Sequence, residues 1–363
     1  MFEEFKKSTK KDWEEKSKSD LKGEDVYSKY KWNIGDLDIL PMYDASDIEN
    51  LDYLDNFKNQ LAKDDDPSGD VRVWKNIQKI AVANCKEANK QALEALNNGA
   101  DGVHFNFTKG PDNINVLLKN ILPEYCHLEF SGLSKSAIEA VLELLSSSKS
   151  YHVFFHSHVD DQYDLIKDSA LMNNSDLRFV SIAISPDVSL DDQVAQALSE
   201  LNRSIRSLLI KGIDIKKISN SFALITDIGT DYFGEIAKTR AIRNQVFQLV
   251  RSYGHEDFSP EDVKIKCSSS PWVNEKYQPH SNMLKGSTAA MAGILGGCDI
   301  LEIQPEQDNS LSNRIARNVS SVLKEESYLA KVADPVAGSY YLESLTDQIS
   351  KSAWNKFISS LED

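Results

Sequence analysis

The 363-residue chain lacks cysteine pairs, long apolar runs and an excess of basic residues. Its four cysteines stand far apart without C-x-x-C spacing, which argues against a zinc knuckle or a redox dithiol and is typical of reduced structural thiols. No apolar run approaches the roughly 20 residues that a membrane helix needs. The 41 basic and 56 acidic residues give a net charge of −15, which disfavours nucleic acid and anionic membranes as partners.

The N-terminal part of the sequence differs from the rest in composition. Its first 20 residues contain neither the apolar segment of a signal peptide nor the Arg-rich, acid-poor composition of a transit peptide, so we expect a cytoplasmic protein. Residues 1–84 combine dense charge with isolated aromatics and an acidic stretch, KDDDPSGD, at 63–70. Such a segment buries little surface alone. We therefore expect an N-terminal arm and linker that forms a subunit interface, or alternatively a helical decoration of the chain's own fold.

Strand-like and helix-like segments alternate from residue 85 to residue 363, and we expect this part to form one domain. The first helix-like segment, CKEANKQALEALNNG, ends at Gly99, a typical helix C-cap residue. Strict alternation indicates parallel strands, and a count of eight favours an α/β fold of the closed (β/α)8 TIM-barrel type. No G-x-G-x-x-G follows a strand, which weighs against a dinucleotide-binding fold. The expected strands are 102–107, 127–132, 151–158, 177–185, 222–229, 263–269, 299–305 and the start of KVADPVAGSYY at residue 331.

Functional residues of such barrels lie where the strands end. His156 and His158 alternate along one expected strand, so both could point into one site as a metal-binding pair. A third ligand would come from Glu129 or Asp227. The alternative is that both histidines lie at the surface or are buried by loops. The serines after the strands lack a G-x-S-x-G elbow and are typical of helix N-caps, as in SKSAIEA.

Several long segments resemble the methylmalonyl-CoA mutase family. These enzymes are adenosylcobalamin-dependent carbon-skeleton isomerases, built on a (β/α)8 barrel that binds acyl-CoA. The N-terminal segments DWEEKSKSDLKGED and ILPMYDASDIENL are similar to the small subunit of the family. The other matching segments are GTDYFGEIAKTRAIR, PWVNEKYQPHSNMLKGSTAAMAGILGGCDIL, SNRIARN and KVADPVAGSYYLESLTDQISKSAW.

The positions that carry chemistry in the catalytic members differ in this sequence. Lys79 or a neighbour stands where the resemblance places a tyrosine, and AISPDVSL contains no histidine where the family has one. Lys266 replaces a second histidine. In the family's D-P-Y-x-N segment, this chain has Gln278, Pro279 and His280, and keeps Asn282.

The resemblance therefore implies a supporting role. No D-x-H-x-x-G motif is present, so we expect no cobalamin-binding domain and no catalytic, cofactor-binding or metal-binding residue in this chain. The resemblance implies a heterodimer in which the large subunit carries adenosylcobalamin and the acyl-CoA, and interconverts methylmalonyl-CoA and succinyl-CoA. Asp334, Ser339, Tyr340 and Tyr341 are then expected to fix a loop. Two alternatives are a metal-dependent barrel enzyme that uses His156 and His158, and a stand-alone barrel that binds a CoA ligand.

Overall fold

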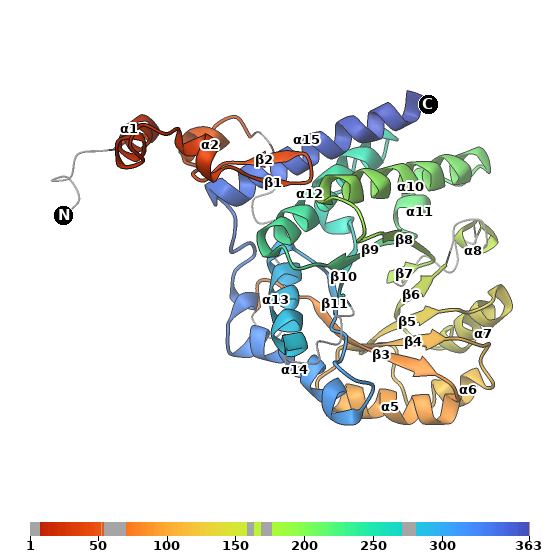
Figure 1. The fold of residues 1–363 in the computed structure, drawn as a ribbon. Helices are drawn as coiled ribbons and strands as arrows, with labels where there is room; N and C mark the ends of the chain where they lie inside the picture. The colour runs from red at the N-terminus through yellow and green to blue at the C-terminus, as the bar shows by residue number, and fades with distance from the viewer. Residues whose placement is uncertain are drawn as a thin grey trace.

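A computed structural model shows a barrel of parallel strands surrounded by helices, with an N-terminal arm that lies on one side (Figure 1). Longer helices cover the outside of the barrel, and the C-terminal helix runs beside the arm. The structure describes residues 8–51, 53, 70–157, 163–167, 176–270 and 281–362.

The barrel closes through a bent strand. Strands β7 and β8 are separated only by Phe179, and β7 pairs with β6 while β8 pairs with β9. Because every other pairing in this sheet is also parallel, the ring is that of a (β/α)8 barrel, as the sequence predicted. The strands are β3 (Lys75–Val82), β4 (Gly102–Phe107), β5 (His127–Ser131), β6 (His152–His156), β7 (Asp176–Arg178), β8 (Val180–Ile184), β9 (Phe222–Ile228), β10 (Ile265–Ser269) and β11 (Ile300–Glu302).

Side-chain caps fix where several helices begin. Asn84 and Ser134 accept backbone N–H groups at the starts of α5 and α7, and Gly99, with φ of +93°, follows the end of α5. Among the described helices, none is both long and apolar enough to cross a membrane. The helices are α5 (Cys85–Asn97), α6 (Ile114–Leu117), α7 (Lys135–Leu145), α8 (Tyr163–Lys167), α10 (Leu190–Ile210), α11 (Ile215–Ser219), α12 (Tyr232–Ser252), α13 (Ser281–Gly296), α14 (Ser310–Glu325) and α15 (Tyr340–Glu362), with 3₁₀ turns at Pro260–Asp262 and Leu329–Lys331.

One strand of the barrel differs from the sequence prediction. The strand expected from residue 331 is absent; that segment ends a 3₁₀ turn and continues into a turn with Gly338 at φ of +79°. The missing strand is β3, which the boundary at residue 84 had assigned to the linker. Its sequence, KNIQKIAV, places polar residues on both faces, which hid the apolar alternation on which the prediction relied.

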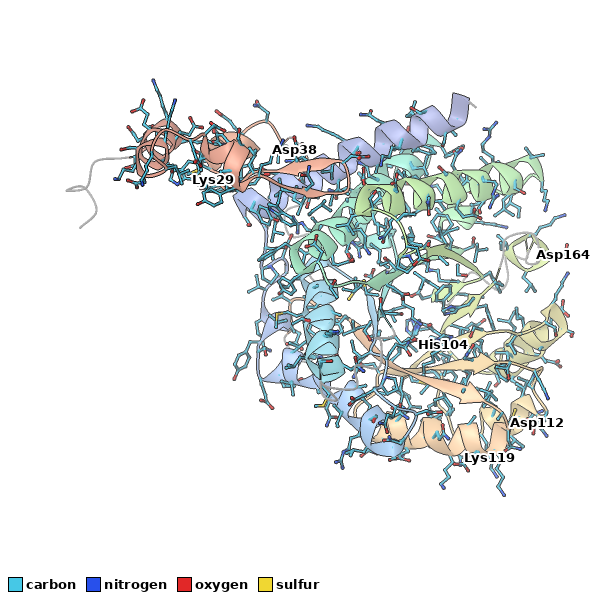
Figure 2. The ribbon with its side chains drawn as sticks, in the orientation of Figure 1. Lys29, Asp38, His104, Asp112, Lys119 and Asp164 are labelled. Atoms are coloured by element: carbon cyan, nitrogen blue, oxygen red, sulfur yellow. The ribbon has the colours of Figure 1, made fainter. Side chains whose placement is uncertain are left out.

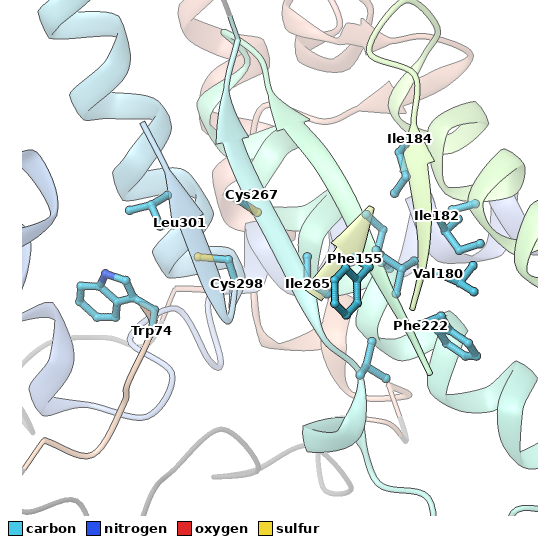
Figure 3. Packing of buried hydrophobic residues seen from close by; sticks show 14 of the residues in the cluster. Trp74, Phe155, Val180, Ile182, Ile184, Phe222, Ile265, Cys267, Cys298 and Leu301 are labelled. Carbon is cyan, nitrogen blue, oxygen red and sulfur yellow. The ribbon is translucent and has the colours of Figure 1, made fainter. Parts of the chain in front are cut away.

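Aromatic side chains form the packing layer between strands and helices. Phe105, Phe130 and Phe155 stack across the neighbouring strands β4, β5 and β6, and Phe179, between β7 and β8, continues the stack, with ring centroids 5.6, 5.4 and 5.8 Å apart. All four are almost fully buried, and Figure 3 shows Phe155 beside the aliphatic side chains of the same core. Stacking of equivalent residues on paired strands adds about 0.2–1 kcal/mol per pair to sheet stability. All four cysteines of the chain are buried and free.

The N-terminal arm contacts the barrel through a hairpin and leaves its first helix outside. The buried residues Ile34 and Ile39 come from the hairpin, and the ring of Tyr43 packs at a tilt of 58° against Tyr341 of α15, with centroids 5.6 Å apart. Helix α1 has no buried residue and projects away from the barrel (Figures 1 and 2). The arm comprises α1 (Lys10–Asp20), α2 (Val26–Tyr30), β1 (Trp32–Ile34), β2 (Leu37–Ile39) and α3 (Ala45–Ile48).

Candidate functional site

The inner face of the barrel carries charged side chains at its centre. Residues paired in register on parallel strands share a face, and Lys79, His104 and Glu129 are paired in this way on β3, β4 and β5. Their neighbours along the strands, such as Ile80 and Phe105, belong to the apolar core beneath the helices. The polar set therefore points inward, and Figure 2 shows His104 within the ring of strands.

Lys266 of β10 holds the centre of this cluster. Its ammonium Nζ donates to Glu129 Oε2 of β5 at 2.6 Å and to Glu302 Oε2 of β11 at 2.6 Å. The same Nζ lies 3.3 Å from Nδ1 of His104. The Lys266 side chain is 1% exposed, and the two carboxylates are equally buried. The ammonium thus links strands from opposite parts of the sheet order through charge-assisted hydrogen bonds.

The ammonium of Lys266 and the two carboxylates favour each other's charged forms. Burial opposes ionisation of Glu129, yet Lys266 and hydrogen bonds from His127 and His156 hold the pKa of its carboxyl well below the usual value. Burial also opposes ionisation of Glu302, but Lys266 and His104 lower its pKa. For Lys266, burial favours the neutral amine, whereas the two carboxylates raise the pKa of the ammonium above its ordinary value. The centre therefore holds two carboxylates and one ammonium.

Two stacked histidines complete the cluster. The rings of His104 and His156 lie 4.5 Å apart at an angle of 14°. His104 Nδ1 donates to Glu302 Oε2 at 2.7 Å, and His156 Nε2 donates to Glu129 Oε2 at 2.7 Å. Burial lowers the pKa of His156 to about 4, although the bond to Glu129 opposes this shift. Burial and the charge of Lys266 lower the pKa of His104 as well, so both rings are neutral at pH 7.

Only some of the expected metal ligands lie close together in the structure. His156 and Glu129 do come together, but the third donor is His104, and the ligand atoms of these three residues lie within 4.8 Å of one another. Asp227 lies on β9 outside that group, and burial raises the pKa of its carboxyl. His158 falls outside the described residues, so its expected role remains a prediction.

Sequence reasoning missed His104 and Glu302. His104 lies in GVHFNF and Glu302 in DILEIQP, where each is an ionisable side chain between apolar residues of a strand-like run. In a (β/α)8 barrel the residues that face the helices must be apolar, so a charged residue in the middle of a strand has to face the barrel centre. An ionisable residue between apolar strand residues was therefore the sequence signal that could have identified His104 and Glu302.

The turn before α15 is fixed by a second buried ion pair. Arg240 of α12 donates one N–H to Asp334 and another to Glu343 Oε1 at 2.8 Å. The same Glu343 oxygen accepts the backbone N–H of Gly338 at 3.0 Å. Tyr341 packs edge-on against Phe233 at 5.5 Å. These contacts attach Asp334 and Tyr341 to the neighbouring helices, as expected for residues that fix a loop, whereas the Tyr340 side chain is exposed.

Several residues singled out by the resemblance can also be placed. Lys79 is exposed on the inner face of β3, and Asn282 lies in the first turn of α13. Lys266 is the central cation described above. Gln278, Pro279 and His280 fall outside the described residues.

Comparison with known proteins identifies the family. The family model described as methylmalonyl-CoA mutase matches residues 187–362. The small subunit of methylmalonyl-CoA mutase from Porphyromonas gingivalis is 30% identical over 402 aligned positions, which include 99% of this chain. The chain belongs to the methylmalonyl-CoA mutase family. Within this family, the large subunit from the same bacterium is 29% identical over 49% of the chain, and the Escherichia coli mutase is 33% identical over 44%.

The chain is shorter than these family members. It spans 64% of the small subunit from P. gingivalis, 26% of the large subunit and 23% of the E. coli mutase. Among solved structures, dihydropteroate synthase from Thermus thermophilus aligns with 69% of the chain and 93% of its own length, at 13% identity and a TM-score of 0.37. The barrel assignment is based on the strand pairing of this chain and not on that similarity.

Proposed function

We propose that this chain is the small subunit of a heterodimeric, adenosylcobalamin-dependent methylmalonyl-CoA mutase, and that it is catalytically inactive alone. In this proposal the large subunit binds adenosylcobalamin and the acyl-CoA, and interconverts methylmalonyl-CoA and succinyl-CoA. The present chain supports that reaction as an isomerase subunit of propionate metabolism in the cytoplasm. The alignment with the P. gingivalis small subunit over 99% of the chain supports this assignment.

The proposal rests mainly on the hydrogen bonds that the ammonium of Lys266 makes inside the protein. A side chain that polarises a thioester carbonyl needs an N–H aimed at the substrate. The resemblance places the histidine with that role in AISPDVSL, which has none, and Lys266 stands where the family has a second histidine. The ammonium of Lys266 is held by Glu129 and Glu302 at 2.6 Å and lies beside His104 at 3.3 Å. The ammonium therefore donates to two carboxylates inside the protein. The barrel centre is organised as a structural ion cluster instead of a site that activates substrate.

While Lys266 occupies the cluster, the histidine nitrogens that face its carboxylates are not available to cobalt either. His104 Nδ1 and His156 Nε2 both donate to carboxylates, and His104 Nε2 lies 2.9 Å from the hydroxyl of Ser131. A ring nitrogen that carries a proton has no lone pair to offer a metal. This supports the placement of the cobalamin on the large subunit.

The arm provides the surface for that partner in this proposal. Helix α1 has no buried residue, and the exposed aromatics Tyr30 and Trp32, at 53% and 42%, lie on the same arm. Aromatic side chains of this kind are enriched among the residues that dominate protein interfaces. A large and a small subunit are both found in P. gingivalis, which is consistent with two chains acting together.

The test is reconstitution with the large subunit encoded in the same genome. We expect a complex on size-exclusion chromatography, with conversion of methylmalonyl-CoA by the complex and none by this chain with adenosylcobalamin. Trp32→Ala should weaken the complex, whereas Tyr125→Ala, which removes an 83% exposed aromatic from the barrel, should not. The proposal would be refuted if the purified chain formed no complex with the large subunit.

A stand-alone CoA-binding barrel remains the second candidate. It is favoured by Lys79 and Ala81, which are exposed on the inner face of β3 within the part of the chain that the structure describes. Calorimetry with coenzyme A and acyl-CoA thioesters separates the two proposals. The small-subunit proposal predicts weak or absent binding to the isolated chain, whereas this candidate requires stoichiometric binding.

A further inference from the structure

The ammonium of Lys266 lies where the donors of a metal site converge. Glu129 Oε2 and Glu302 Oε2 are each 2.6 Å from Nζ, and His104 Nδ1 is 3.3 Å away. His156 Nε2 lies 2.7 Å from the same Glu129 oxygen. Two carboxylates and one imidazole thus surround one cationic atom, and a second imidazole bonds to one of those carboxylates.

The charge of this arrangement suits a divalent ion better than an ammonium. The two carboxylates carry two negative charges, and Lys266 supplies one positive charge, so one negative charge remains uncompensated within the cluster. A divalent cation at the same position would neutralise both carboxylates. Imidazole nitrogen together with carboxylate oxygen is a donor set that Zn²⁺, Co²⁺ and Ni²⁺ favour, whereas Mg²⁺ and Ca²⁺ prefer oxygen alone.

The donor atoms are near enough to one another to coordinate a single ion. The ligand atoms of His104, Glu129 and His156 are within 4.8 Å of one another, and zinc bonds of about 2.0–2.1 Å in a tetrahedron require donors about 3.3 Å apart. Outer contacts already orient two of them: Ser131 lies 2.9 Å from His104 Nε2, and His127 donates to Glu129 Oε1 at 3.2 Å. Such supporting bonds are typical of metal sites. The His156 side chain is 13% exposed, which gives access from the end of β6.

We propose that His104, Glu129 and His156 form a transition-metal site in which the ammonium of Lys266 takes the place of the ion. With Lys266 present, the cluster is held together without metal. When the ammonium is removed, each imidazole can move its proton to the other ring nitrogen and offer the lone pair, and Zn²⁺ or Co²⁺ binds with Glu302 as a fourth donor. This inference stands independently of the mutase assignment.

The test compares metal binding by the full wild-type chain and by Lys266→Met, which keeps an unbranched side chain one atom shorter and removes its charge. Equilibrium dialysis with ZnCl₂ should show one Zn²⁺ per chain for the variant, with an affinity at least about 100-fold above that of the wild type. Co²⁺ should give the visible absorption bands of a tetrahedral site. Loss of zinc binding in Lys266→Met/His156→Ala, but not in Lys266→Met/His152→Ala, would localise the ion, since His152 is an exposed histidine of the same strand.

Folding of the variant is controlled separately. Lys266→Met/Glu302→Gln removes one of the two carboxylates that lose their counterion, and it keeps His104, Glu129 and His156. We expect this double variant to fold, to bind Zn²⁺, and to melt at a higher temperature with Zn²⁺ than with Mg²⁺. The proposal is overturned if the folded variants bind zinc no better than the wild type, if binding survives His156→Ala, or if the wild type binds zinc equally tightly.

Discussion

Lys266→Met tests how much the central ammonium stabilises the barrel. At an effective dielectric constant of about 20, a charge separation of 2.6 Å represents about 6 kcal/mol of attraction for each carboxylate. Burial of each ion costs several kcal/mol, so the intact cluster is close to balance. The variant keeps two buried carboxylates but loses the cation that offsets their burial. We therefore expect the free energy of unfolding to fall by about 3–5 kcal/mol at pH 7.5.

The pH dependence of this loss identifies its cause. Glu129 and Glu302 have depressed pKa values in the native wild type, so their stabilising contribution is present above the unfolded pKa and is lost as pH falls through the folded values. Without Lys266 that depression disappears, and a buried carboxyl can take up a proton at mildly acidic pH. The difference in unfolding free energy between variant and wild type should therefore shrink as the pH is lowered from 7.5 to 4.5.

Urea unfolding followed by far-UV circular dichroism measures these free energies. Lys75→Met is the matched control, because Lys75 is an exposed lysine at the start of β3, and it should change stability by less than about 0.5 kcal/mol. Lys266→Met/Glu302→Gln should recover part of the loss. A deficit for Lys266→Met below about 1 kcal/mol at pH 7.5, or one that grows on acidification, would refute the reasoning.

Three further predictions concern the second ion pair, a close backbone approach and a buried histidine. Arg240→Met leaves Glu343 buried without its cation and should cost about 3–5 kcal/mol in urea unfolding; a change within experimental error would contradict the structural role of this pair. Gly102→Ala should cost about 1–3 kcal/mol, because its Cβ would lie 2.2 Å from a backbone carbonyl oxygen of β5, whereas Gly110→Ala, with open space around it, should be neutral; equal effects would argue against the strand spacing. His156, with a pKa of about 4, stays neutral in the folded chain while the unfolded chain takes up a proton below about 6.5, so stability falls as pH drops from about 6.5 to 4. His156→Gln should lower the slope of unfolding free energy against pH in that window by up to about 1.4 kcal/mol per pH unit, and an unchanged slope would contradict the assignment.

The barrel could be predicted from the sequence because its outer packing is regular. Apolar strand runs such as 222–229 alternate with long helix patterns, and parallel pairing follows from that alternation. The error at one strand has a local cause. β3 carries Asn76, Gln78 and Lys79 among its apolar residues, so periodicity did not reveal it, while the turn at residue 334 supplied a false strand signal.

The central cluster could be predicted only in part because its contacts depend on the register of strands distant in sequence. His104 and Glu302 are 198 positions apart, and Lys266 reaches Glu129 across 137 positions. Periodicity identifies which residues share a face of one strand, but it does not say which strands face one another across the barrel. The pair of His156 and Glu129 was accessible because both lie at expected strand ends.

The most direct measurement of the central claim is turnover by the isolated chain. The purified protein would be incubated with methylmalonyl-CoA and adenosylcobalamin, with and without the large subunit, and succinyl-CoA would be quantified by mass spectrometry. We expect succinyl-CoA only when the large subunit is present, since the ammonium of Lys266 donates its hydrogen bonds to Glu129 and Glu302. Sustained formation of succinyl-CoA by this chain alone would contradict it.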